Sequence, residues 1–155
     1  MRVFEVMTKD VITLKKENTI LDAMKLMKEK EIGFLIIEEN KEAIGVITDR
    51  DIVLSLSREI SYNTNITKVM KKYVITIDEE TEVSEASDLM GYMQVRRLVA
   101  INKDNKISGV LSVSDLLRNP LTEDLALETM IEISYAFPTK IVEIDNILQT
   151  NVFIL

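Results

Sequence analysis

Hydrophobic and polar residues follow one another along this chain in short blocks that have the lengths of strands and helices. Asp10–Leu14 is rich in β-branched residues, which is typical of a short strand. Asn18 or Thr19 then has the polar side chain of a helix N-cap, and apolar residues recur at the spacing of one helix face through about Lys30. The continuous apolar run Gly33–Ile37 predicts a strand that is buried on both faces.

A hairpin and a short helix complete this unit, and the whole order of elements then recurs. Glu38–Glu42 is polar and predicts a turn, Ala43–Ile47 has the pattern of a strand, and Thr48–Leu56 that of a short helix. The order strand, helix, strand, strand, helix is predicted again at Val74–Ile77, Glu82–Met93, Leu98–Ile101, Ile107–Leu111 and Ser112–Leu117. We expect Thr81 to cap the first of these later helices, and the polar connection Ser57–Thr67 to lie on the surface between the two units.

The residues themselves repeat as well. Gly45–Asp51 (GVITDRD) recurs as Gly109–Asp115 (GVLSVSD), and Met7 recurs 63 positions later as Met70. Further matches at the same offset are Val11 with Val74, Thr13 with Thr76, Ala23 with Ala86 and Met27 with Met90. A duplicated unit of roughly 60 residues predicts two equivalent clefts related by a pseudo-two-fold axis.

A segment of different character follows Pro120. Thr122–Asp124 is a good helix start, because its carboxylates lie where the helix dipole favours them, and we expect an amphipathic helix that ends before Pro138. Lys140–Ile144 predicts a strand. Asn151–Leu155 is apolar to the last residue, so we expect this tail to pack against the core or to hold a second subunit.

Composition narrows the class of protein. The 155 residues fit one compact domain or two fused small modules, and we expect boundaries at 1–60, 61–119 and 120–155. Hydrophobic residues make up 46% of the chain but aromatic residues only 5%, so the core is expected to be aliphatic. No apolar run is long enough to span a bilayer, the N-terminus lacks the apolar stretch of a signal peptide, and cysteine is absent, so we expect a cytoplasmic protein without a membrane partner.

Missing residue types exclude several kinds of chemistry. Without histidine or cysteine the chain has no Ser-His-Asp triad, no Cys-His dyad, no zinc finger and no thiolate chemistry. A net charge of −7 argues against general nucleic-acid binding, which needs clustered Lys and Arg. Acid–base catalysis by carboxylates stays open as an alternative, but no paired Asp/Glu constellation stands out. We therefore expect neither an enzyme, nor a metal site, nor a nucleic-acid partner.

The repeated motif has the chemistry of an adenosine phosphate site. A strand ends at Thr48 or Ser112 and a helix begins, so the hydroxyl can cap the helix while the first-turn N–H groups form an anion site. Three residues later, the carboxylate of Asp51 or Asp115 can accept two hydrogen bonds from the 2′- and 3′-hydroxyls of a ribose. An apolar slot between strands would hold a purine ring. The same spacing is also a plain capping box, so structural capping is the alternative for each copy.

The repeat, its length and its closing motif resemble the CBS domain, and the pair resembles a Bateman module. The match covers roughly Met7–Leu117, and Val6–Thr8 and Val69–Lys71 stand where the family has its Val-Met-Thr opening. The resemblance implies a mixed α/β fold of the α+β kind. It consists of tandem β-α-β-β-α repeats packed through their sheets as a pseudo-two-fold disc.

The resemblance also implies how each cleft is assembled, with the Asp motif of one repeat facing the strand-to-helix segment of the other. One cleft would combine Ser112, Ser114 and Asp115 with Asn18, Thr19 and Ala23, and the other would combine Thr48, Arg50 and Asp51 with Thr81 and Ala86. The aspartates are expected to hold ribose and the hydroxyls of Thr48, Ser112 and Ser114 to hold phosphate, while the small alanines let the base approach.

The middle strand departs from the family pattern, which often reads His-Arg-Leu-Pro-Val-Val. Neither repeat has the proline, and only the second has a basic pair, Arg96 and Arg97. Together with Arg50, these guanidinium groups are candidates for neutralising phosphate, and a surface ion pair is the alternative for each. We therefore expect the two clefts to differ in their attraction for phosphate.

The leading functional hypothesis is a non-catalytic regulatory module. It would bind an adenine nucleotide (AMP, ADP or ATP) or an S-adenosyl compound and act through a separate regulated protein. A homodimer is also expected. The alternative is a structural dimerisation or interaction module whose clefts carry no ligand.

Overall fold

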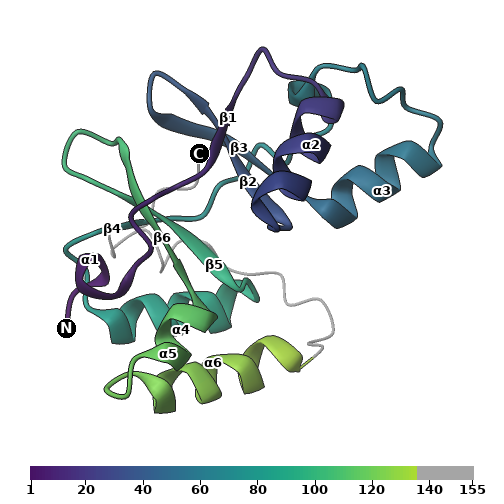
Figure 1. The fold of residues 1–155 in the computed structure, drawn as a ribbon. Coiled ribbons are helices and arrows are strands. Elements are labelled where there is room, and N and C mark those ends of the chain that lie inside the picture. Colours follow the sequence, from purple (N-terminus) through teal and green to yellow (C-terminus); the bar gives the residue numbers. More distant parts are fainter. Residues whose placement is uncertain (136–155) are drawn as a thin grey trace. The chain divides into compact units, whose positions relative to one another are not determined.

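The computed structural model of the chain describes residues 1–135, which form two compact units (Figure 1). One unit is Ile12–Val74, and the other joins Met1–Val11 to the described chain from Ile75 onward. Each unit contains a three-stranded sheet. The predicted strand at Lys140–Ile144 and the apolar end Asn151–Leu155 lie outside the described residues.

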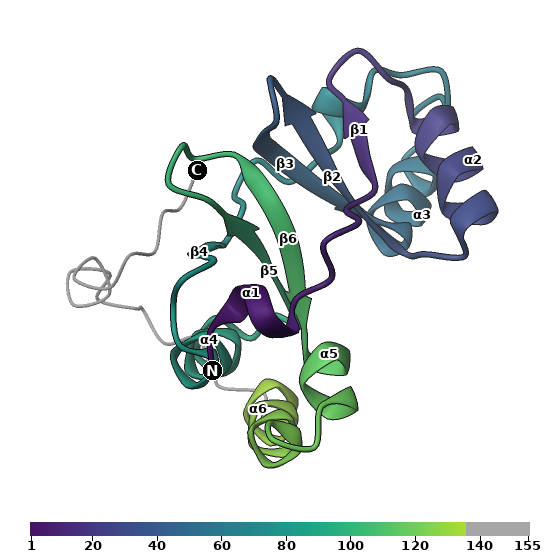
Figure 2. The same ribbon diagram turned by 60° about the vertical axis from the view of Figure 1, so that its left-hand side comes forward.

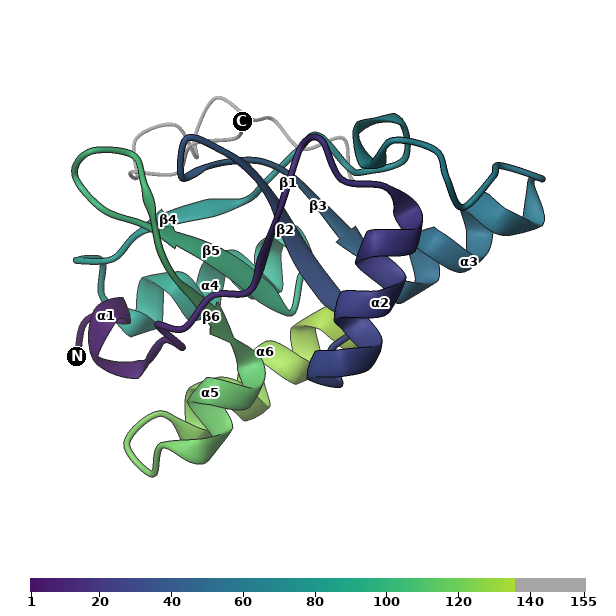
Figure 3. The same ribbon diagram turned by 45° about the horizontal axis from the view of Figure 1, so that its top comes forward.

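In the Ile12–Val74 unit, two helices cover one face of the sheet (Figure 3). Its elements are β1 (Thr13–Lys15), α2 (Ile20–Lys30), β2 (Phe34–Glu39), β3 (Glu42–Thr48), α3 (Asp49–Ser57) and the 3-10 helix η1 (Ile66–Lys68). Strand β1 is parallel to β2, and β2 is antiparallel to β3. The aliphatic core between helices and sheet contains Leu14, Ile20, Ala23, Met27, Leu35, Ile37, Ile47 and Ile52.

The second unit repeats this order and adds a helix at each end (Figure 2). Its elements are α1 (Val3–Val6), β4 (Thr76–Asp78), α4 (Val83–Met93), β5 (Arg97–Ile101), β6 (Ile107–Ser112), α5 (Val113–Arg118) and α6 (Glu123–Ser134). Helix α6 packs on α4 and α5, where Thr129 is buried and its hydroxyl lies 2.5 Å from that of Ser87. The predicted start of this helix is confirmed, because Thr122 is its N-cap.

The segment that opens each sequence repeat packs on the sheet of the other repeat. Thr8 and Val110 exchange two backbone hydrogen bonds of 2.9 Å, and Lys71 and Val46 do the same. In each case the preceding methionine occupies the space beside a glycine, because a Cβ on Gly109 would clash with Met7 and a Cβ on Gly45 would clash with Met70. The compact units therefore differ from the ranges 1–60 and 61–119, since they exchange their opening segments.

The mixed α/β fold and the repeated β-α-β-β-α order are confirmed. The apolar run at the second strand is buried on both faces, since Leu35, Ile36 and Ile37 have no exposed surface. The hairpin turn is shorter than predicted, because β2 and β3 pair up to Glu39 and Glu42. Only two residues remain in the turn, and their positive φ angles of 53° and 65° are those of a type I′ turn.

Thr81 is not the N-cap of the following helix, so that prediction was wrong. Glu82 is the N-cap, and its side chain makes no capping hydrogen bond. The N-terminal segment performs this task instead, because the N–H of Val83 donates to the carbonyl oxygen of Met1 at 2.9 Å. Helix α1 and η1 were not predicted, and Ile66 in η1 is fully buried although its segment was expected on the surface.

Candidate functional site

The first Thr-x-x-Asp motif joins the end of β3 to the start of α3 and forms a complete capping box. The backbone N–H of Thr48 donates to Oδ2 of Asp51 at 3.0 Å, and its hydroxyl donates to the same oxygen at 2.6 Å. In return, the Asp51 N–H donates to the Thr48 hydroxyl oxygen at 3.2 Å. The motif therefore holds its own carboxylate at the N-terminus of the helix.

The other oxygen of the Asp51 carboxylate faces a cation. The ammonium group of Lys71 lies 3.0 Å from Oδ1, and the aspartate side chain is only 13% exposed. Burial by itself raises the pKa of Asp51, but the hydrogen bonds from Thr48 and Lys71 outweigh it, so the pKa lies below its ordinary value. The carboxylate is therefore ionised at neutral pH and presents a negative charge close to an exposed positive one.

The second motif, between β6 and α5, has the same capping box and a more crowded carboxylate. Oδ2 of Asp115 accepts from the N–H of Ser112 at 2.8 Å and from its hydroxyl at 2.5 Å. Oδ1 accepts from the hydroxyl of Thr8 at 3.2 Å and from Nη2 of Arg118 at 2.5 Å. The Asp115 side chain is 6% exposed, so this cluster is largely withdrawn from water.

The candidate residues before α2 form a third capping box. Thr19 is the N-cap, and its N–H donates to Oδ2 of Asp22 at 2.8 Å. This backbone hydrogen bond, with those from the side chains of Thr19 and Asn18, lowers the pKa of Asp22. Ala23 follows with no exposed surface, so it lies in the core and not on an open face.

The remaining candidates divide between core and surface. Ala86 has no exposed surface, whereas Arg50, Arg96, Arg97 and Ser114 are exposed. Thr81 accepts a backbone hydrogen bond from Val3 through its carbonyl oxygen. Of the predicted residues, the structure therefore joins Thr48 to Asp51, Ser112 to Asp115 and Asn18 to Thr19 through Asp22. Asn18, Thr19, Ala23, Thr48, Arg50 and Asp51 belong to the Ile12–Val74 unit, and the other candidates belong to the second unit.

Three residues at the motifs were missed by the sequence reasoning: Thr8, Lys71 and Arg118. Thr8 and Lys71 are matching positions of the repeat, and each contacts the aspartate of a motif far from it in sequence. Arg118 stands three residues after Asp115 on the same helix, a spacing at which side chains of opposite charge meet. That spacing was a signal in the sequence, whereas no local pattern pointed to the other two.

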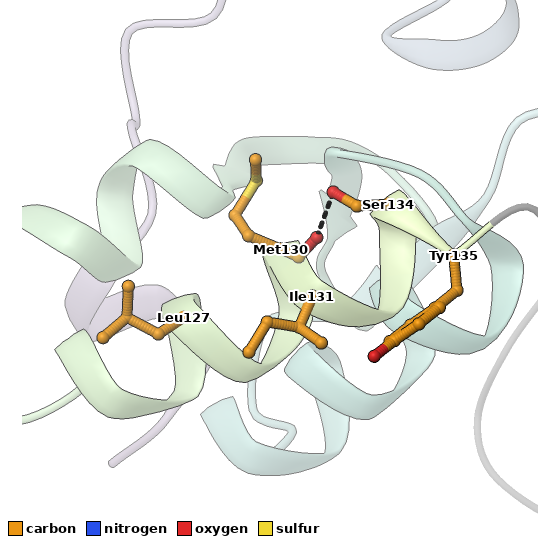
Figure 4. Close-up of a pocket in the computed structure, with 5 residues that line it drawn as sticks. All are labelled: Leu127, Met130, Ile131, Ser134 and Tyr135. Atoms are coloured by element: carbon orange, nitrogen blue, oxygen red, sulfur yellow. Dashed lines mark hydrogen bonds between the residues drawn. The ribbon is translucent and has the colours of Figure 1, made fainter.

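Outside the motifs, α6 presents an apolar surface to solvent (Figure 4). Leu127, Ile131 and Tyr135 follow one another at four-residue spacing and are 52%, 56% and 63% exposed. Met130 and Ser134 complete the lining of this shallow pocket. Acidic residues flank it along the helix, and Glu123–Ser134 contains no basic residue.

Comparison with known families decides the class of protein. The sequence model of the CBS domain matches this chain twice, at residues 3–58 and 66–121. The chain belongs to the CBS domain family. Paired CBS domains are regulatory and not catalytic modules, which agrees with the expectation that the chain is no enzyme.

Curated relatives share most of the repeat region. An uncharacterised protein of Acidianus ambivalens is 36% identical over 118 residues, which cover 76% of this chain and 71% of the relative. The CBS domain-containing protein YhcV of Bacillus subtilis is 29% identical over 132 residues, covering 84% of this chain and 94% of YhcV.

Solved structures agree with the fold. Hypoxic Response Protein I with two coordinated zinc ions is 26% identical, with a TM-score of 0.69 over 77% of this chain and 98% of that protein. A CBS domain protein from Pyrobaculum aerophilum complexed with AMP is 20% identical, with a TM-score of 0.72 over 84% of this chain and 99% of that protein. The CBS domain pair of protein MJ0100, in complex with 5′-methylthioadenosine and S-adenosyl-L-methionine, is 24% identical. Its TM-score is 0.68 over 76% of this chain and 94% of that protein.

Residues 1–135 are the part of the chain that the structure describes. No helix in this part of the chain is long and apolar enough to cross a membrane. In the same residues, no group of three or more acidic side chains converges in a way that could hold a metal ion.

Proposed function

We propose that this CBS domain pair is a regulatory module that binds an adenosine-containing ligand at its Thr/Ser-x-x-Asp motifs. The ligand would be AMP, ADP or ATP, with an S-adenosyl compound as the alternative, and a separate protein would be regulated. The observation that carries the proposal is the repeated placement of an aspartate and a hydroxyl at a helix N-terminus. A cytoplasmic location belongs to the same proposal.

The chemistry of the motifs supports this choice. An ionised carboxylate such as that of Asp51 is a strong acceptor for the hydroxyls of a ribose, and first-turn N–H groups favour an anion. In this proposal Asp51 and Asp115 hold ribose, while Thr48, Ser112 and Ser114 contact phosphate. The adenosine ligands of the Pyrobaculum aerophilum protein and of MJ0100 support the ligand class.

The remaining candidate residues have supporting roles in the proposal. The exposed guanidinium groups of Arg50, Arg96 and Arg97 would attract the ligand's phosphates. The small side chains of Ala23 and Ala86 would leave room for the base. The segments around Asn18, Thr19 and Thr81 would complete the surroundings of the nucleoside.

Isothermal titration with AMP, ADP, ATP and S-adenosylmethionine tests the proposal, after a check that no nucleotide co-purifies. Replacing Asp51 by Asn should weaken binding roughly 10- to 150-fold, which corresponds to about 1.5–3 kcal/mol for hydrogen bonds to a charged group. Asp49→Asn is the matched control, because it removes an exposed carboxylate from the same helical turn. Equal binding by both variants would refute the role of Asp51, and absence of binding by every compound would refute the function.

A second candidate function, an interaction module that forms a homodimer, is favoured by the exposed apolar side chains of α6. In this case a second copy of the chain would cover Leu127, Ile131 and Tyr135. Sedimentation velocity should then give twice the chain mass of 17.7 kDa. Ile131→Glu should give the monomer, whereas Lys103→Gln, an equal change of charge at another exposed residue, should not. A monomeric wild-type protein would exclude this candidate.

A further inference from the structure

The two motif carboxylates differ in how many hydrogen bonds they already accept. A carboxylate has about four lone-pair positions for donors. Within residues 1–135, Asp51 accepts three hydrogen bonds, two from Thr48 and one from Lys71. Asp115 accepts four, two from Ser112 and one each from Thr8 and Arg118. Only Asp51 therefore keeps an acceptor position for a further hydroxyl.

This difference originates in one substitution between the repeats. Lys71 and Thr8 are matching positions, and each donates one hydrogen bond to Oδ1 of its aspartate. Arg118 donates the extra one, and its counterpart in the first repeat is Leu54, which has no donor in its side chain. Because of Arg118, all four acceptor positions of the Asp115 carboxylate are taken, whereas the Asp51 carboxylate keeps one.

We infer that the two motifs are unequal ligand sites, and that Arg118 is the residue that blocks the second one. This inference rests on the proposed function. At Asp51 a ribose hydroxyl can bind while every existing partner stays in place. At Asp115 a hydroxyl must first displace a donor, and Arg118 can leave because 70% of its side chain is exposed to water.

The partners of Arg118 explain why the blocked state persists without a ligand. A guanidinium–carboxylate hydrogen bond is short and charge-assisted, and this carboxylate is only 6% exposed, so water competes poorly for it. Thr8, by contrast, has its backbone fixed by two hydrogen bonds to Val110, so its hydroxyl can leave Asp115 only by rotation of the side chain. The second motif is therefore expected to bind later in a titration than the first.

Exchanging the two counterpart residues tests this inference with AMP as the probe. Arg118→Leu places the residue of the first repeat in the second and should tighten the weaker site at least about tenfold, with no change at the stronger one. Leu54→Arg should weaken the stronger site by a similar factor. Arg58→Leu is the control, because it removes an exposed arginine that contacts neither motif aspartate. In the double variant Asp51→Asn/Arg118→Leu, the AMP binding that remains is assigned to Asp115.

The outcomes separate this inference from the function on which it rests. Two equal sites in the wild type, unchanged by Arg118→Leu, would overturn the inference and leave the proposed function intact. Binding by no variant at all would overturn both. Should Arg118→Leu lower the melting temperature, Arg118→Met retains a long, flexible side chain without a donor and gives the same comparison.

Discussion

The exchange of opening segments makes a strong prediction about Met7. This side chain is 8% exposed and belongs to the core of the second unit, together with Val3 and Leu111. Replacing Met7 by Ala removes three heavy atoms from that core and leaves a cavity beside Gly109. Substitutions of buried methionine by alanine cost about 2–5 kcal/mol, a large part of the roughly 5–15 kcal/mol that stabilises a typical protein.

Hydrogen exchange read out by mass spectrometry locates the effect of Met7→Ala along the chain. Amides of β4, β5 and β6 should exchange about 30-fold faster or more, since each 1.4 kcal/mol corresponds to a factor of ten. Amides of Ile12–Val74 should keep their protection, although Met7 stands directly before this segment in the sequence. The loss of protection is therefore expected far from the substitution in sequence and close to it in space.

Met24→Ala is the matched control for this experiment. Met24 is 37% exposed on α2, so the same change of side chain should have a small effect, confined to the Ile12–Val74 unit. Faster exchange of α2 and β1–β3 in Met7→Ala, with β4–β6 unaffected, would refute the exchange of opening segments.

Three further predictions concern local geometry. Gly45→Ala should lower the melting temperature more than Gly109→Ala, because its Cβ would lie 2.9 Å from the backbone carbonyl oxygen of Lys71, whereas the three atoms nearest to a Cβ on Gly109 all belong to the movable side chain of Met7. Thermal melts that rank the two variants in reverse would contradict this. Because folding lowers the pKa of Asp51, its ionised carboxylate contributes stability that is complete above the unfolded-state pKa of about 3.9 and is lost as the pH falls through the lowered folded-state pKa. In urea unfolding from pH 7 to 3, the free energy of unfolding should therefore decrease less steeply for Asp51→Asn than for the wild type. Lys41→Gly should stabilise the hairpin by roughly 0.5–1 kcal/mol, because Lys41 has a φ of 65° and Asn-Gly suits a type I′ turn; an unchanged urea midpoint would contradict it.

The local features of this protein were predictable because the interactions that create them span few residues. Each capping box joins a hydroxyl to an aspartate three residues later, so the helix starts at Thr19, Thr48 and Ser112 could be derived from the sequence. The aliphatic run of β2 predicted burial on both faces for a similar reason, since neighbouring side chains of a strand point to opposite faces. The helix start at Thr81 failed because a segment from the other end of the unit, and not a neighbouring side chain, satisfies the N–H of Val83.

By itself, the sequence determined that the chain is a duplicated unit, which elements each copy forms, and that a carboxylate stands at the start of each closing helix. Only the tertiary structure decided that the distant donors Lys71 and Thr8 meet these carboxylates. Thr8 and Asp115 are 107 residues apart, and both repeats have a methionine in the opening segment and a glycine in the sheet. Sequence spacing carries no information about such a choice, because it depends on which packing gives the lower free energy for the whole chain.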